Sequence, residues 1–439
     1  MVKKIGFVPL LLIVLGLTGY LLLVLVYCIP TERIERNVRD SANIFEREDT
    51  YHLLIRHGNS QLDNYTDALM LLIAAYPSQD LWSSPINARH YTGEPCQVLV
   101  DVYRDGETGN TVTFARYWHG YLLFLKPLLT FFNYSTIRYM MIFAQMGLFV
   151  LIIYKLSQRN KEMIIPTFLF WIFLNPVATM MSLQFNSVLI VTFLAMLVVL
   201  YVDEHWKAED GLYVWGVLFL LFGVLTNYID LLTYPLVTLG VPLILWLSIR
   251  LSPDIRENVK RILASSLFWF IGYGGMWELK WLLGSIITGE NIFAEAYVSM
   301  LIRTSSSYSD MTFDFWDIME RQWEAARNSV WKLALIALFV YWLYKVLRVG
   351  KIHINLLVPY MIVAIYPFVW YFVMKNHSFL HYFFTYRELA ISLYAFAAMC
   401  VAVHKGERGN KSGGDMNERN CVVGKEISAE FIDRNADKC

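Results

Sequence analysis

Long apolar runs, separated by short polar segments, occupy most of the chain up to about residue 404. A helix that crosses a membrane needs about 20 consecutive and mostly apolar residues, because the hydrocarbon core offers no water to exposed backbone groups. The runs therefore predict an all-α integral membrane protein with about ten transmembrane helices. These helices are predicted near residues 5–28, 136–154, 163–181, 185–202, 211–226, 232–249, 262–284, 331–347, 354–374 and 387–404.

The first apolar run, from Ile5 to Cys28, follows two lysines, as the apolar part of a secretory signal peptide does. It is longer than the roughly 7–15 apolar residues of a signal peptide. In addition, no small-residue cleavage site precedes Thr31. We interpret this run as an uncleaved first span.

The segment 117–132 is also apolar, but it is only 16 residues long and contains His119, Lys126 and Pro127. We interpret it as a helix that lies at or dips into the outer membrane interface. The alternative is a true span, which would reverse the direction of 136–154 and move the basic segment after it to the outside. The distribution of charge disfavours that alternative.

Lysine and arginine residues are concentrated in alternate loops, and such loops usually face the cytoplasm. The basic residues in these segments are Lys3, Lys4, Lys155, Arg159, Lys161, Arg250, Arg256, Lys260, Arg261, Lys345, Arg348 and Lys351. The short loops at 182–184 and 227–231 contain no lysine or arginine. The pattern therefore predicts that both termini are cytoplasmic.

This orientation gives the predicted domain organisation. Residues 1–404 form the transmembrane domain, with a first outer loop and interfacial helices over 30–135 and a second outer loop over 285–330. The polar segment 405–439 has no hydrophobic periodicity and is predicted to be a disordered cytoplasmic tail.

Composition limits the function classes. Apolar residues make up 56% of the chain and charged residues 17%, against about 25% charged residues in soluble domains. The formal net charge is zero, so no nucleic-acid partner is predicted. The five cysteines show no CxxC pair and no metal spacing, and therefore neither a metal site nor a disulfide framework is expected.

Two carboxylates in the first outer loop are candidates for catalysis. Asp63 and Asp67 are four residues apart and would share one face of a helix. A carboxylate just outside the membrane can accept the proton of a hydroxyl nucleophile, which is the role of a general base. The structural alternative is that Asp63 or Thr66 caps the helix predicted over the apolar run 68–76. We predict Asp67 as the base, because it borders that run, and Asp63 as the second candidate.

The loop between the last two predicted spans is rich in cations and hydrogen-bond donors for an outer segment. It contains Lys375, His377, His381 and Arg387. Such groups suit a phosphate or diphosphate, so these residues are predicted to bind the phosphate of a donor. One alternative is a metal-binding histidine pair, for which a recognisable third ligand is missing. The other is lysine and arginine side chains that extend to lipid headgroups.

Further candidates lie at the start of the interfacial segment. Tyr117, Trp118 and His119 are predicted to contact substrate, because aromatic rings stack on sugars and a histidine can bind a sugar or a phosphate. The alternative is that these aromatic residues anchor the helix at the membrane surface.

Three charged residues lie near the outer ends of other predicted spans. Glu278 and Lys280 are close to the end of 262–284, where charges are costly if they face lipid. Lys280 is predicted to contact the donor phosphate, and Glu278 and Asp230 are predicted to contact substrate. The alternative for Glu278 and Lys280 is an ion pair near the interface.

The first predicted span, the carboxylate loop 62–67 and the segment 119–129 together resemble parts of GT-C type glycosyltransferases. The segment 119–129 is similar to the His-Pro-Pro-Leu type stretch of related transferases, although the double proline is absent. Residues 133–153, with Arg138 near their outer start, resemble the second span of these enzymes. The resemblance is architectural and covers about residues 1–404.

The resemblance implies a GT-C-like fold and a glycosyltransferase that uses a polyprenyl-phosphate-linked sugar. The sugar, a hexose or a pentose, would pass to a hydroxyl of a glycan or lipid acceptor at the outer face of the bacterial cytoplasmic membrane. A carboxylate would take the acceptor proton while cations stabilise the leaving phosphate, in a single inverting displacement that needs no metal cofactor. The implied partners are the donor, the acceptor and membrane lipids.

Two other functions fit a polytopic membrane protein. A transporter or lipid flippase predicts charged or helix-broken sites near mid-membrane, often in repeated halves. The predicted spans carry few such charges, and no internal repeat is visible. An outer-face glycan polymerase or ligase shares the chemistry and differs only in its acceptor.

Overall fold

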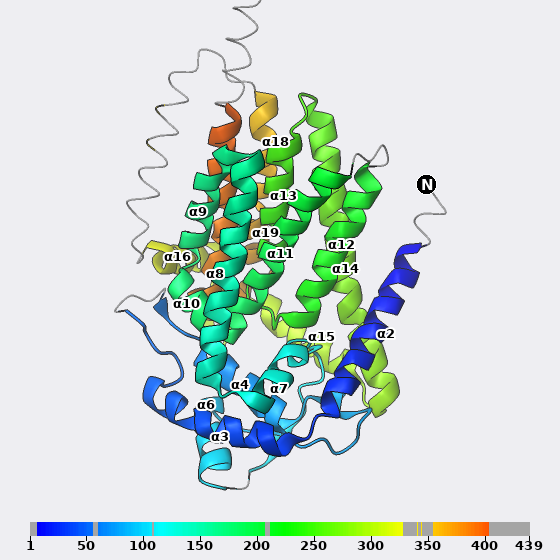
Figure 1. Cartoon of the computed structure of the whole chain (residues 1–439), viewed down its shortest axis with the longest axis vertical. Helices are drawn as coiled ribbons and strands as arrows, with labels where there is room; N and C mark the ends of the chain where they lie inside the picture. The colour runs from blue at the N-terminus through cyan, green and yellow to red at the C-terminus, as the bar shows by residue number, and fades with distance from the viewer. Residues whose placement is uncertain are drawn as a thin grey trace, which may run out of the picture.

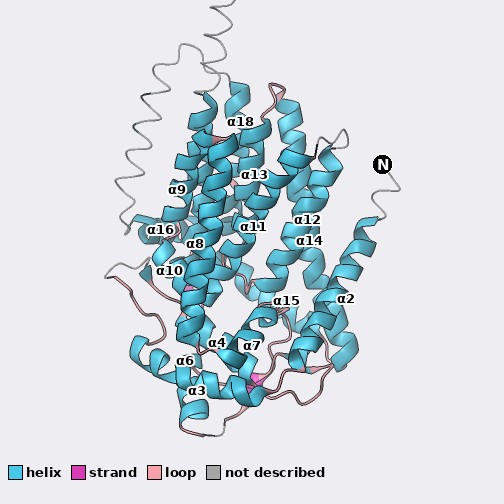
Figure 2. Cartoon of the chain, viewed as in Figure 1, coloured by secondary structure: helices cyan, strands magenta, loops and turns pink. Residues whose placement is uncertain are grey.

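Helices form nearly all of the regular structure (Figure 2). The computed structural model describes residues 7–55, 60–107, 109–206, 211–327, 340, 344 and 354–403. Long helices build a bundle that is capped at one end by shorter helices, several of which lie across it (Figure 1). The named strands in the described residues form two short antiparallel pairs, β1 (His90–Tyr91) with β2 (Thr111–Val112) and β3 (Ser307–Tyr308) with β4 (Met311–Thr312).

Six helical segments among the described residues are long and apolar enough to cross a membrane. They confirm the all-α membrane class and coincide with six of the predicted spans. They are α2 (Phe7–Tyr27), α8 (Tyr134–Arg159), α11 (Leu183–His205), α12 (Gly211–Ile229), Asn355–Val373 and Tyr382–Val403. The fifth segment comprises α18 (Ile354–Ala364) and α19 (Tyr366–Val373), and the sixth begins with α21 (Tyr382–Thr385) and η4 (Tyr386–Glu388).

Three further predicted spans have different outcomes. The segment 262–284 lies within α14 (Ile255–Thr288), whose 34 residues extend about 51 Å at roughly 1.5 Å per residue. The segment 232–249 is represented by the shorter α13 (Val237–Arg250), which has 14 residues. The segment 331–347 falls almost entirely outside the described residues.

The remaining predicted span, 163–181, is interrupted. It comprises η3 (Lys161–Met163), α9 (Ile164–Phe173) and α10 (Pro176–Met181). Asn175 adopts a left-handed conformation with a φ of 56°, and Pro176 has no backbone N–H to continue the preceding helix. The segment therefore forms two short helices in place of one continuous span.

The segment between α2 and α8 forms the cap of the bundle (Figure 1). Its helices are α3 (Thr31–Glu48), α4 (Asn64–Ala75), α5 (Ser84–Asn87), α6 (Pro95–Leu99), η2 (Val100–Arg104) and α7 (Leu122–Phe131). The amphipathic α3 buries Ile34, Val38 and Phe45 in the apolar core of the cap. The 10 residues of α7 extend about 15 Å, half of the hydrocarbon thickness. Helix α7 is therefore shorter than the six candidate spans, and the interfacial position of this segment stays a prediction.

Glycines allow α12 and α14 to pack backbone against backbone. A Cβ atom on Gly223 would lie 2.2 Å from the carbonyl oxygen of Trp269, and one on Gly272 would lie 2.2 Å from that of Leu220. Glycine permits this approach because it places no side chain between the two backbones. Apolar helices in a membrane associate through close packing of this kind. Helices α12 and α14 lie side by side within the bundle (Figure 1).

The second outer segment and the loop before the last span complete the fold. They contribute α15 (Ile292–Thr304), α16 (Phe315–Arg327) and α20 (Lys375–Leu380). Helices α15 and α16 lie in the segment 285–330, which is predicted as the second outer loop. The predicted disordered tail, 405–439, lies outside the described residues.

Candidate functional site

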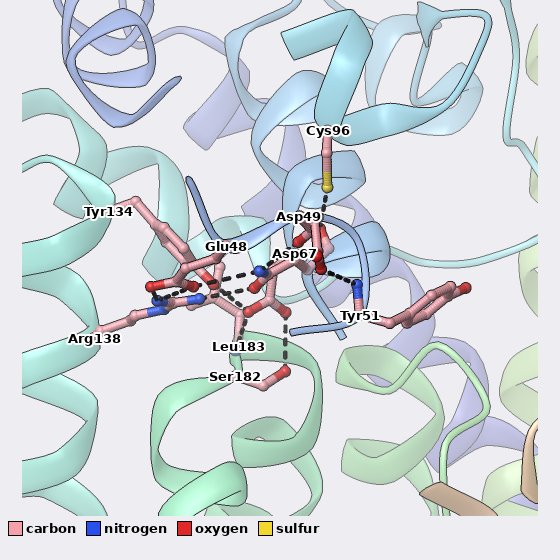
Figure 3. Close-up of polar contacts among 10 residues, drawn as sticks. Glu48, Asp49, Tyr51, Asp67, Cys96, Tyr134, Arg138, Ser182 and Leu183 are labelled. Atoms are coloured by element: carbon pink, nitrogen blue, oxygen red, sulfur yellow. Dashed lines mark hydrogen bonds and ion pairs between the residues drawn. The ribbon is translucent and has the colours of Figure 1, made fainter. Parts of the chain in front are cut away.

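Asp67 holds α4 against the first turn of α11 (Figure 3). Its buried carboxylate accepts hydrogen bonds from Ser182 Oγ at 3.1 Å, from the backbone N–H of Leu183 at 2.8 Å and from that of Gln184 at 3.0 Å. The hydroxyl of Tyr134 on α8 donates a further short bond. Four donors from two helices therefore converge on this carboxylate, an arrangement that joins α4, α8 and α11.

A second set of polar contacts surrounds this junction (Figure 3). The Arg138 Nη1 atom donates to both carboxylate oxygens of Glu48, at 2.9 and 2.8 Å, and Nη2 donates to Asn64 Oδ1 at 2.8 Å. Its guanidinium carbon lies 4.4 Å from the centre of the Tyr134 ring. Arg138, which matched the outer start of a GT-C second span, therefore ties α8 to α3 and α4.

Asp63 is the N-cap of α4, so the capping interpretation is confirmed for this residue. Its carboxylate accepts from the Thr66 backbone N–H at 3.1 Å and from Thr66 Oγ1 at 2.7 Å. Burial raises the pKa of Asp63 to about 7, and Asp67 adds to the rise, while the bonds from Thr66 and the charge of Arg387 oppose it. Unlike Asp67, Asp63 also lines a cavity. A general base works best when its pKa is near the operating pH, so Asp63 suits that role.

This cavity has a volume of about 610 Å³ and lies between the cap, α15 and the loop 377–384. Its titratable lining residues include Asp63, His90, Arg116, Arg303, His377 and His381. Its aromatic lining residues are Tyr51, Tyr65, Phe114, Tyr117, Phe383 and Phe384. One aspartate, two guanidinium groups and several aromatic faces therefore surround a space that is large enough for a sugar phosphate.

Arg303 fixes the tautomer of His377. Its Nη1 atom lies 2.7 Å from His377 Nδ1, and an arginine can only donate, so Nδ1 is the acceptor. The neutral ring then carries its proton on Nε2, a buried atom without a hydrogen-bond partner among the described residues. Burial first, and then Arg303 and His381, hold the pKa of His377 well below its usual value, although the Leu232 carbonyl opposes this.

His381 lies beside His377, with 4.9 Å between the ring centres and 51° between the ring planes. Burial, assisted by Arg303, lowers the pKa of His381 to about 4. Both imidazoles are therefore neutral near pH 7. The positive charge of the cavity comes from arginines, and the histidines can supply neutral hydrogen-bonding groups.

The two cavity arginines were not among the residues predicted from the sequence. Arg303 is at the last turn of α15, and Arg116 precedes the interfacial segment. The Arg116 Nη1 atom lies 2.8 Å from Glu295 Oε1, an ion pair that joins the segment before α7 to α15. The sequence could have indicated Arg303, because it lies in a segment predicted to be outside the cell. Arginine is less common in outer loops than in cytoplasmic loops, so its presence there is a reason to expect a function.

Arg387 lies outside the lining of the cavity and is fully buried. Its Nε atom donates to the Leu174 carbonyl at 3.0 Å, and Nη1 donates to the Phe383 carbonyl at 3.1 Å. The guanidinium carbon lies 4.3 Å from the centre of the Phe185 ring. Leu174 follows the last residue of α9, at the break between α9 and α10. Its carbonyl has no partner within the helix there, and Arg387 supplies the missing hydrogen bond.

The predicted lysine ligands also lie away from the cavity lining. The buried Lys280 Nζ donates to the Ile86 carbonyl at 3.1 Å and lies 5.6 Å from the centre of the Trp118 ring. Lys375 Nζ lies 5.2 Å from the centre of the Phe372 ring. Glu278 is exposed, whereas Lys280 is buried. The two residues are two positions apart on one helix, so their side chains point in different directions.

The predicted substrate contacts divide in the same way. Tyr117 lines the cavity. The Trp118 Nε1 atom donates to the Met276 carbonyl at 2.7 Å, so this ring fastens the cap to α14. Both ring nitrogens of His119 are occupied, Nδ1 by the Tyr121 hydroxyl at 3.0 Å and Nε2 by the Phe114 carbonyl at 2.8 Å.

Asp230 closes the turn that precedes α13. Its two carboxylate oxygens lie 3.1 and 3.0 Å from the Thr233 backbone N–H, and the Thr233 hydroxyl donates a further short bond. Burial raises the pKa of Asp230 to about 6, while the bonds from Thr233 oppose the rise. The position of Asp230 outside the cavity lining favours a structural role.

Comparison with known proteins identifies no relative. No protein-family model, curated protein or solved structure matches the chain. Among the described residues, no group of three or more histidine, cysteine, aspartate or glutamate side chains is arranged to hold a metal ion.

Proposed function

We propose that the chain is a GT-C type glycosyltransferase that moves a sugar from a polyprenyl-phosphate donor to an acceptor hydroxyl. The observation that carries this proposal is the cavity in which Asp63 lies together with Arg303 and His377. A carboxylate with a pKa of about 7 supplies a base, and the guanidinium group supplies a partner for phosphate. The aromatic lining suits the apolar faces of a sugar.

The proposed reaction is a single displacement at the anomeric carbon. Asp63 removes the proton of the acceptor hydroxyl while that oxygen forms a bond to the anomeric carbon. The bond from this carbon to the phosphate oxygen breaks, and the bonding electrons leave with the polyprenyl phosphate. Arg303 stabilises the departing anion, and the neutral His377 donates a hydrogen bond from Nε2. Attack opposite to the leaving group inverts the configuration of the sugar.

A transfer assay tests the function directly. The full chain, reconstituted in liposomes, would be supplied with polyprenyl-phosphate-linked hexoses and pentoses that carry a radiolabel in the sugar. Acceptor extracts from bacterial envelopes provide glycan and lipid hydroxyls. Release of polyprenyl phosphate that depends on the acceptor supports the proposal. Movement of the intact labelled donor across the bilayer without cleavage would instead identify a flippase.

A transporter is the second candidate, because two features of the bundle fit it. Arg387 and Glu388 are fully buried within a helix that is apolar enough to cross a membrane, and α9 and α10 are interrupted beside them. Broken helices with buried charges are typical of transporter substrate sites. Here, however, Arg387 donates to two backbone carbonyls and Glu388 Oε1 accepts from the Leu236 N–H at 3.1 Å, which leaves only Arg387 Nη2 and Glu388 Oε2 without a partner among the described residues. This use favours the enzyme.

The proposed topology has ten spans, both termini in the cytoplasm and the cavity at the outer face. We expect a cysteine at Gln79 to react with a membrane-impermeant maleimide in intact cells, and one at Gln158 to react only after permeabilisation. Both positions are exposed, and they lie at opposite ends of the bundle by the proposed topology. The native cysteines would first be replaced by serine. The reverse labelling pattern would contradict the outer location of the cavity.

Arg303→Ala is expected to weaken binding of a short-chain polyprenyl phosphate by roughly 10- to 100-fold, because a hydrogen bond to a charged group contributes about 1.5–3 kcal/mol. Arg303→Lys should give an intermediate loss, since it keeps the charge but not the planar fork. Titration of the purified protein with farnesyl phosphate provides the measurement.

Lys375→Ala is the matched control for Arg303→Ala. Lys375 is a cation of the predicted phosphate loop, but it lies beside Phe372 outside the cavity lining. Its removal should leave the affinity unchanged. A greater loss in Lys375→Ala than in Arg303→Ala would return the phosphate site to the location that the sequence predicted.

A further inference from the structure

A second cavity lies among the helix ends remote from the cap. Since Asp67 binds the first turn of α11, the last turn of α11 marks the opposite end of the bundle. There the ends of α11 and α13 meet the beginnings of α12 and α14 around a space of about 480 Å³. This cavity shares no lining residue with the candidate active site.

The charged lining of this second cavity has a surplus of cations. Among the described residues, Arg250, Lys260 and Arg261 line it together with Asp203 and Glu257, so three positive charges face two negative ones, a net charge of +1 for this part of the lining. Arg250 is paired with Asp203, and Arg261 is paired with Glu257. Lys260 is exposed and has no ion-pair partner among the described residues. Among the described residues that line this cavity, Lys260 is therefore the cation without an ionic partner.

Two tryptophans, Trp215 and Trp246, line the same cavity. Trp215 and Trp246 are stacked, with 4.4 Å between their ring centres, and the Arg261 guanidinium carbon lies 5.7 Å from the centre of the Trp246 ring. Trp246 is only 3% exposed, and its Nε1 has no hydrogen-bond partner among the described residues. An indole N–H can only donate, so this buried group requires an acceptor that the described protein atoms do not supply.

The rim of the cavity has the character of a membrane interface. Trp206 and Leu212, which line the cavity, are exposed by 57% and 44% and lie at the ends of two helices that are apolar enough to cross a membrane. Aromatic side chains collect where hydrocarbon meets headgroups. A ligand that enters this cavity therefore approaches at headgroup depth.

We infer that this second cavity binds the phosphate of an anionic phospholipid headgroup. Lys260 supplies a cation, the Trp246 Nε1 atom supplies a buried donor, and Arg261 adds positive charge above the indole ring. The same phosphate chemistry would suit a free phosphate ester. The interfacial rim favours the lipid, whose glycerol and acyl chains would extend past Trp206 and Leu212.

Native mass spectrometry of the full purified chain tests this site by titration with phosphatidylglycerol or phosphatidylcholine. We expect Lys260→Gln to weaken phosphatidylglycerol binding by roughly fivefold, because one basic residue contributes about that factor at an anionic lipid surface. Trp246→Phe, which retains the ring but not the donor, should weaken binding by a similar factor. Phosphatidylcholine should bind more weakly and respond little to Lys260→Gln.

Arg256→Gln is the matched control, because Arg256 is exposed in the first turn of α14 and lies outside the cavity lining. Equal affinity for phosphatidylglycerol in Lys260→Gln, Trp246→Phe and Arg256→Gln would overturn the site. Glycerol 3-phosphate provides the second arm. If it binds as tightly as phosphatidylglycerol, the assignment to a lipid is wrong. Lys260→Gln is expected to leave folding unchanged, because this side chain is exposed and has no ion pair among the described residues.

Discussion

Asp63→Asn is expected to reduce the rate of sugar transfer by about 10²- to 10⁴-fold, the usual contribution of a general base. An amide cannot accept the proton of the acceptor hydroxyl, but it can still cap α4, because asparagine and aspartate are equally good N-cap residues. The Thr66 N–H would keep its acceptor. The variant should therefore fold and bind donor like the wild type while its kcat falls. Initial rates of polyprenyl phosphate release provide the measurement.

The pH profile supplies a control for this role. With a pKa of about 7, Asp63 is protonated in acid and cannot act as a base, so the transfer rate should fall about tenfold per pH unit below 7. Above pH 7 the rate should level off. Asp63→Asn should remove this dependence from the residual activity. A wild-type rate in Asp63→Asn would exclude Asp63 as the base.

Asp67→Ala is expected to lower the free energy of unfolding by about 3–5 kcal/mol, because each buried donor that is left without an acceptor costs about 1–3 kcal/mol. The substitution leaves the Tyr134 and Ser182 hydroxyls and the two N–H groups at the start of α11 without their acceptor. The junction between α4, α8 and α11 should then loosen. The midpoint of thermal unfolding in detergent provides the measurement.

Asp63→Asn serves as the comparison for Asp67→Ala. We expect the first variant to lose activity at nearly unchanged stability and the second to lose stability. Asp67→Asn should be less destabilising than Asp67→Ala, because its amide oxygen still accepts part of the bonds. An Asp67→Ala protein with wild-type stability but no transfer would restore Asp67 as the catalytic base.

The sequence was a poor guide to the partners of buried charges. Lys126, Lys280 and Arg387 lie in apolar segments, and a charge in such a place indicates a nearby polar partner. In each case the partner is a backbone carbonyl, of Ala74, Ile86 and Leu174 respectively. Two of these carbonyls lie at a helix end or break, where intrahelical bonds cease, and Ile86 lies within the four-residue α5. The sequence pattern around a buried cation does not show whether its partner is such a carbonyl or the phosphate of a ligand.

The loop 375–387 shows the same limit in a single segment. The sequence grouped Lys375, His377, His381 and Arg387 because they are close along the chain. The fold directs His377 and His381 into the cavity and places Lys375 and Arg387 elsewhere. The direction of each side chain depends on the backbone turn between α20 and α21. The spacing of these residues in the sequence does not determine that direction.

By itself, the sequence determined the all-α membrane class and the positions of six apolar spans, because the need to satisfy the backbone in hydrocarbon acts on each segment separately. It also predicted a short helix at the segment of α7, and it offered Asp63 as a helix cap as one of two alternatives, which the structure confirms. Only the tertiary structure chose Asp63 over Asp67 as the cavity carboxylate and brought Arg303 to His377. The physical reason is that a cavity is defined by segments distant in the chain, whose packing decides which polar groups bind the protein and which remain open to a ligand.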